Sequence, residues 1–146
     1  MRQRPSSSIA LGMQDPKNLA VTEHAYRLAI GVYRLTATFP AEERFTLVQQ
    51  MRRAAVSIGS NISEGCGRRG DRELLNCLYI AFAEAKELGF QLRVSDGLDF
   101  GDSSERARLL SDLDRLERML NRLTAYLRAR PARKKETGRP MVRAPL

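Results

Sequence analysis

The chain has 146 residues, which suits one domain with a core of modest size. It contains no Trp and few β-branched runs, so its composition favours an α-helical fold over a sheet. No stretch approaches the ~18 uncharged apolar residues of a membrane span, and the N-terminal residues lack the long apolar segment of a secretory signal. We therefore expect a cytoplasmic protein without a membrane anchor.

The formal net charge of +8 is concentrated at the two ends of the sequence. Residues 18–127 contain 15 Lys/Arg and 15 Asp/Glu and are neutral. Residues 1–17 carry three bases and one acid, and residues 128–146 carry seven bases and one acid. Cys66 and Cys77 are expected on two different helices as reduced, small and at least half-buried side chains.

Residues 1–17 are rich in Ser, Pro and Gly and predict a flexible leader. Asn18 is the expected N-cap of a first helix that runs to about Thr36. Apolar residues recur along this helix at Val21, Ala25, Leu28, Val32 and Leu35. Pro40 is expected to begin the second helix, with Glu42 and Glu43 near its positive end.

The second helix has an apolar face beside a polar seam. Its apolar positions are Val48, Met51, Ala55, Ile58 and Ile62. Small residues such as Ser57, Gly59 and Gly65 weaken a helix, so it either ends near Ile58 or continues because a neighbour packs closely against it. We favour close packing, because both stripes stay in phase through Glu64.

Two further helices complete the expected bundle, which spans residues 18–127. Gly70 ends the second helix, and Asp71 caps a third that reaches about Asp96. Asp102 and Glu105 have the spacing of a capping box that starts the fourth. That helix carries a leucine seam at Leu109, Leu113, Leu116, Leu120, Leu123 and Leu127. Four helices with short connections predict an all-α, antiparallel up-down four-helix bundle.

The polar seam of the second helix comprises Arg52, Arg53, Ser57, Asn61, Glu64 and Arg68. One interpretation is a packing or interface network, in which Glu64 pairs with Arg68 and Asn61 spans a helix contact. A phosphate site built on the arginines and a catalytic site are the alternatives.

Nothing in the sequence favours catalysis, a metal or a cofactor. His24 is the only histidine and is expected to be solvated, and there is no Cys/His cluster with metal-ligand spacing. The paired carboxylates at Glu42–Glu43 and Asp112–Asp114 are expected on solvated helix faces.

Residues 128–146 lack periodicity and contain three prolines, which predicts a disordered basic tail. Its cations are Arg128, Arg130, Arg133, Lys134, Lys135, Arg139 and Arg143. These could bind phosphates with strong salt dependence and little sequence preference, because the tail has no aromatic residue to stack on bases. A merely solubilising tail is the alternative.

Residues 19–92 resemble the four-helix bundle family typified by ribosomal-RNA intervening-sequence proteins. The resemblance is carried by Thr36, Phe39-Pro40, Glu43, Gln50, Arg52-Arg53-Ala54, Ser57-Ile58, Asn61-Ile62, Glu64-Gly65 and Arg68. It implies a left-handed antiparallel bundle assembled as a homopentamer. A related branch, the accessory variability determinants of diversity-generating retroelements, works with a reverse transcriptase and binds nucleic acid.

Together these features predict a non-enzymatic, oligomeric accessory protein that binds RNA or DNA through its basic tails and exposed arginines. The competing hypothesis is a protein-interaction scaffold with incidental tails. A third hypothesis, a ribonuclease-like enzyme, lacks an evident acid–base pair.

Overall fold

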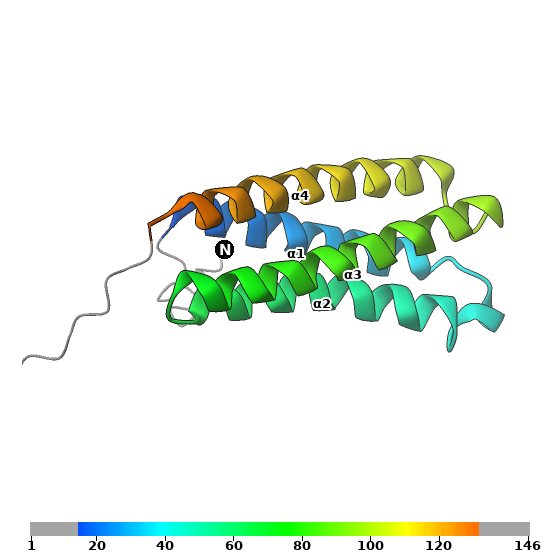
Figure 1. Cartoon of the computed structure of the whole chain (residues 1–146). Helices are drawn as coiled ribbons and strands as arrows, with labels where there is room; N and C mark the ends of the chain where they lie inside the picture. Colours follow the sequence, from blue (N-terminus) through cyan, green and yellow to red (C-terminus); the bar gives the residue numbers. More distant parts are fainter. Residues whose placement is uncertain (1–14, 132–146) are drawn as a thin grey trace, which may run out of the picture.

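The computed structural model describes residues 15–131 as four helices joined by short connections (Figure 1). They are α1 (Pro16–Thr36), α2 (Leu47–Gly67), α3 (Asp71–Gly97) and α4 (Ser103–Ala129), with a 3-10 turn, η1 (Ala41–Glu43), before α2. The described part contains no strand, which confirms the predicted all-α class. None of these helices is long and apolar enough to cross a membrane.

Each helix contacts two others, in the closed order α1–α2–α3–α4–α1. The first turn of α1, the turn between α2 and α3, and the last turn of α4 lie at one end of the molecule (Figure 1). η1 and the α3–α4 loop lie at the other end. Along the α1–α4 contact, Lys17 meets Tyr126 and Gly31 meets Leu109, so residue numbers rise on one helix as they fall on the other.

The core is built from the apolar stripes that the sequence predicts. Every leucine of the α4 seam is buried, and so are the predicted apolar positions of α1 and α2. Leu28, Met51, Ile58, Leu88, Leu116 and Leu120 are among the fully buried side chains. The predicted heptad-like spacing of α1 and α4 therefore does place one face of each helix in the core.

The starts of α1, α2 and α3 differ from the sequence predictions. For α3, Gly70 and not Asp71 is the N-cap, and Asp71 is the first residue of the helix. Asp15, not Asn18, caps α1, since its carboxylate accepts a hydrogen bond of 2.9 Å from the Lys17 amide. Pro16 then occupies the first turn, where a missing N–H costs nothing. Pro40 precedes η1 rather than α2, and α2 begins at Leu47 because the backbone of Thr46 departs from helical geometry.

α2 continues through its glycines to Gly67, as close packing predicts. At Gly65 an added Cβ would lie 2.7 Å from the Cβ of Cys77 on α3. This glycine therefore lets the two helices approach more closely than any larger residue would allow.

The α3–α4 loop is held by a buried arginine. Arg106 is 2% exposed, and its guanidinium donates to the carboxylates of Asp96 and Asp99. It also donates to the carbonyls of Phe100 and Gly101, at 2.6 Å each. The carboxylate of Asp102 accepts from the Glu105 amide at 2.9 Å, which is the N-cap that the sequence predicts.

Candidate functional site

Arg52 of the α2 seam binds α1 rather than other seam residues. Its Nε donates to the Thr36 hydroxyl at 2.9 Å, and one terminal nitrogen donates to the Tyr33 carbonyl at 3.4 Å. The guanidinium also lies 4.6 Å from the centroid of the Tyr33 ring. Because Thr36 is buried, Arg52 fixes the end of α1 against α2.

Arg53 faces α3 instead. Its guanidinium lies 3.6 Å from a carboxylate oxygen of Glu87, which also accepts from the Gln91 amide at 3.3 Å. Glu84 lies in the same region, and burial together with the negative charge of Glu87 raises its pKa. This is a network between α2 and α3.

The remaining seam residues bond within α2. The Asn61 amide donates to the carbonyl and the hydroxyl of Ser57, at 2.8 and 3.2 Å. The prediction that Asn61 spans a helix contact is therefore wrong among residues 15–131, because its side chain folds back one turn. Glu64 and Arg68 form the predicted ion pair, at 2.5 Å, with both side chains about half exposed. The seam residues thus make four separate contacts. Arg52, Arg53 and Ser57 line one hollow beside Tyr33, whereas Asn61, Glu64 and Arg68 do not.

Two of the seven cations assigned to the basic tail lie within the described residues, and both contact the bundle. α4 ends at Ala129, two residues later than predicted, so Arg128 lies in its last turn, 5.7 Å from the Tyr79 ring centroid. Arg130 lies 3.5 Å from a carboxylate oxygen of Asp71 and 5.6 Å from the centroid of Tyr126. Arg133, Lys134, Lys135, Arg139 and Arg143 lie outside the described residues.

Two further cations join them at this end of the bundle. The ammonium of Lys17 lies 3.7 Å from the Tyr126 ring centroid. Arg122 helps to line a hollow of about 350 Å³ between α1 and α4, together with Lys17, Tyr126 and apolar side chains. We call Lys17, Arg122, Arg128 and Arg130 the arm-base cluster. Lys17 is expected in the leader from the sequence, but it lies in the first turn of α1, and the fold brings the start of α1 beside the end of α4.

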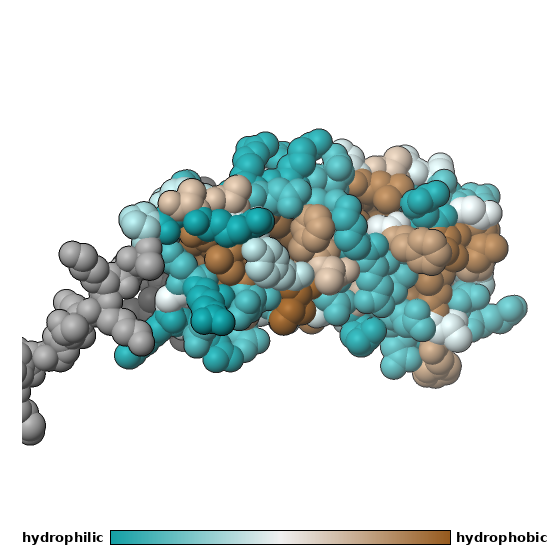
Figure 2. Space-filling view, viewed as in Figure 1, coloured by the Kyte–Doolittle hydropathy of each residue, from teal (hydrophilic) through white to brown (hydrophobic). Residues whose placement is uncertain are grey.

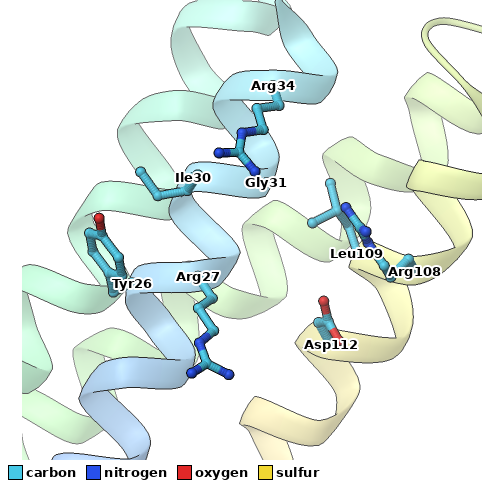
Figure 3. A pocket seen from close by; sticks show the side chains of 8 residues that line it. All are labelled: Tyr26, Arg27, Ile30, Gly31, Arg34, Arg108, Leu109 and Asp112. Atoms are coloured by element: carbon cyan, nitrogen blue, oxygen red, sulfur yellow. The ribbon is translucent and has the colours of Figure 1, made fainter. Parts of the chain in front are cut away.

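A second hollow, of about 390 Å³, opens between α1 and α4 nearer the middle of the bundle (Figure 3). It is lined by Tyr26, Arg27, Ile30, Gly31, Arg34, Arg108, Leu109 and Asp112. Figure 3 shows Arg34 of α1 and Arg108 of α4 on opposite sides of the gap between the two helices. Within residues 15–131 neither makes an ion pair or a side-chain hydrogen bond, whereas Arg27 pairs with Glu23 at 3.3 Å.

His24 lies close to this hollow and is half-buried, so the expectation that it is solvated is wrong. Its Nε2 lies 2.8 Å from the Asp112 carbonyl, and because a carbonyl only accepts, Nε2 must carry the hydrogen. The ring ties α1 to α4. Cys66 and Cys77 are free and half-buried, as predicted, and burial is the main cause that raises the pKa of the Cys66 thiol. No group of three His, Cys, Asp or Glu residues between 15 and 131 is placed to hold a metal ion.

The sequence matches the family described as "23S rRNA-intervening sequence protein" over residues 17–122. The fold is similar to the crystal structure of a protein of unknown function from the S23 ribosomal protein family of Bacteroides thetaiotaomicron. The TM-score is 0.66 and the sequence identity 21%, over 75% of this chain and 98% of that one. Among curated proteins the sequence has no match.

Proposed function

Because the chain belongs to the 23S rRNA-intervening sequence protein family, we propose that it is a non-enzymatic accessory factor that associates with RNA or DNA in the cytoplasm. The name of the family refers to ribosomal RNA and supports a nucleic-acid partner. The only histidine donates a hydrogen bond to a backbone carbonyl, which supports a structural rather than a catalytic use of that ring.

The arm-base cluster carries this proposal. Four cations lie around two exposed tyrosines, Tyr79 and Tyr126, at the end of the bundle where α4 finishes. Five further Lys/Arg and a single acid follow in the sequence after Pro131. Cations that continue from the arm-base cluster into the following residues attract phosphates and release their counterions. The rings of Tyr79 and Tyr126 add a surface on which bases can stack.

We further propose an antiparallel up-down bundle of left-handed twist that assembles as a homo-oligomer, with a pentamer as the favoured state. The opposed numbering along the α1–α4 contact supports the antiparallel arrangement. A pentamer would bring together a net charge of about +30 from the residues after 127, so weak contacts at each copy would combine through avidity. A reverse transcriptase or another protein would then be a second partner of the assembly.

The experiment titrates labelled RNA and duplex DNA with the full chain at low and at physiological salt. The variant R128Q/R130Q removes the cation in the last turn of α4 and the cation at its C-cap. R93Q/R115Q is its matched control, since both of these arginines are exposed elsewhere on the bundle. A third variant replaces the five later cations with glutamine. We expect the first and third variants to lower both the affinity and its salt slope, and the control to leave them unchanged. No binding by the natural chain at either salt concentration would refute the proposal.

A protein-interaction scaffold is the alternative function. It is favoured by apolar side chains on the outer face of α3, where Ile80 is 50% and Phe90 67% exposed. On the face shown in Figure 2, however, hydrophobic side chains are interspersed with hydrophilic ones and do not form one continuous apolar surface. If a protein partner binds α3, replacing both residues with alanine should weaken binding of that partner and leave nucleic-acid binding unchanged.

A further inference from the structure

The outer surface of α1 carries a row of tyrosines beside a row of arginines. Tyr26 and Tyr33 are seven residues apart, and so are Arg27 and Arg34. Seven residues are close to two helical turns, so each pair repeats on one face at a spacing of about 10.5 Å. Tyr26 is 59% and Tyr33 44% exposed, and both arginines are exposed as well. The two rows run side by side along the helix.

A neighbouring helix extends each row. On the arginine side, Arg108 of α4 faces Arg34 across the hollow in Figure 3. That gap has an apolar floor, and at Gly31 an added Cβ would lie 2.5 Å from a methyl carbon of Leu109. On the tyrosine side, Arg52 lies over the Tyr33 ring at 4.6 Å. Arg108 therefore adds a cation to the arginine row, and Arg52 adds one to the tyrosine row.

The charge balance of this face is positive. Its cations are Arg27, Arg34, Arg44, Arg52 and Arg108, where Arg44 lines the adjoining hollow beside Tyr33. The acids that face them are Glu23, which pairs with Arg27, and Asp112 of α4. Since residues 18–127 are neutral as a whole, an excess of three cations here is a local surplus and not an average property of the bundle.

We propose that this face, the α1 ridge of Tyr26, Arg27, Tyr33, Arg34 and Arg108, binds single-stranded nucleic acid. Phosphates lie between Arg34 and Arg108, and unpaired bases stack on the two tyrosines. The inference rests on the proposed function and narrows its substrate class. A duplex buries the faces of its bases, so exposed tyrosines gain stacking contacts only with a single strand. The spacing of the tyrosines equals about three nucleotides at 3.4 Å each.

The test measures fluorescence anisotropy of a labelled 12-nucleotide pyrimidine RNA, of the same RNA in a duplex, and of the single strand in competition with uridine monophosphate. The full chain is compared with Y26A/Y33A, Y26F/Y33F, R34Q/R108Q and the matched control I80A/F90A, which removes exposed apolar side chains from α3. Circular dichroism checks folding, and light scattering checks the oligomeric state of every variant.

We expect Y26A/Y33A to weaken binding of the single strand about tenfold or more, while binding of the duplex changes little. Y26F/Y33F should restore affinity to within about twofold, because phenylalanine still stacks. R34Q/R108Q should reduce the salt slope for the single strand by about 1.4, which corresponds to two phosphates. The α3 control should bind like the natural chain.

Three results would overturn the inference while leaving the proposed function intact. The single strand could bind unchanged to Y26A/Y33A yet be lost when the cations after Pro131 are replaced. Uridine monophosphate could bind as tightly as the strand, which would indicate a site for a free nucleotide. The tyrosine variant could lose its oligomeric state, which would show that the ridge contacts a second copy. Absence of any binding by the natural chain would instead refute the proposed function, and the inference with it.

Discussion

The glycines of α2 allow a direct test of how closely α2 and α3 pack. Gly59 and Gly65 both lie inside the same helix, but their surroundings differ. A Cβ at Gly59 would lie 3.8 Å from the Cβ of Ala25, an ordinary contact. A Cβ at Gly65 would lie 2.7 Å from the Cβ of Cys77 and 3.0 Å from a methyl carbon of Leu74. The same substitution, glycine to alanine, should therefore have opposite effects.

Gly59→Ala should stabilise the fold. Replacing a helical glycine by alanine gains roughly 0.5–1 kcal/mol, because alanine loses less backbone entropy on folding. At Gly65 that gain is opposed by overpacking, which costs about 1–3 kcal/mol. The obstructing atom is a Cβ attached to the backbone of α3, so a rotamer change cannot relieve the contact. We expect Gly65→Ala to lower the free energy of unfolding by about 1–2 kcal/mol.

Thermal unfolding followed by circular dichroism measures this difference. At this chain length the two variants should differ in Tm by roughly 5–10 °C, with Gly59→Ala above the natural chain and Gly65→Ala below it. Cys77→Gly removes the obstructing Cβ and provides the control. In that background Gly65→Ala should no longer destabilise. If Gly65→Ala is as stable as the natural chain, the close approach of α2 and α3 does not constrain the fold and the reasoning fails.

Two further predictions concern charged groups. Arg106→Gln should lower Tm well below that of the surface control Arg93→Gln, because it leaves the carbonyls of Phe100 and Gly101 without a donor. Arg106→Lys should restore little of the lost Tm, since one ammonium cannot replace the planar guanidinium. A Tm for Arg106→Lys equal to that of the natural chain would contradict this account. Glu84→Gln should raise stability at pH 7, because burial raises the pKa of this carboxyl and the folded state therefore binds its proton more tightly than the unfolded state. The stability of the natural chain relative to Glu84→Gln should increase as pH falls from neutral toward about 4.3, the ordinary pKa of glutamate. Denaturant titrations of both proteins at pH 7 and 4.5 measure this change. The same difference in the free energy of unfolding at the two pH values would refute this cause.

The sequence predicts the core well because burial follows helical periodicity. The α4 leucines are buried at every predicted position. The continuation of α2 through weak helix-forming residues could also be predicted, because its stripes remain in phase and small residues allow a close neighbour. In both cases one helix carries enough information to predict the outcome.

Contacts between distant segments could not be predicted in this way. The pattern identifies Arg52 as polar, but only the structure shows that it binds Thr36. Arg34 and Arg108 are 74 positions apart, and their shared hollow depends on the register between α1 and α4. The sequence alone does not decide the start of α1, because Asp15 and Asn18 are both good N-caps and the advantage of Asp15 comes from the proline that follows it.

The contact between Lys17 and Tyr126 has a mechanical consequence. It places the first turn of α1 against the last turns of α4, so the start of α1 and the end of α4 lie side by side at one end of the bundle. Tension applied between residues 15 and 131 would load this contact first and then peel the two helices apart, one turn after another. Force applied in this geometry breaks contacts successively and does not shear the whole core at once. The bundle should therefore yield to a low pulling force even when its equilibrium stability is high.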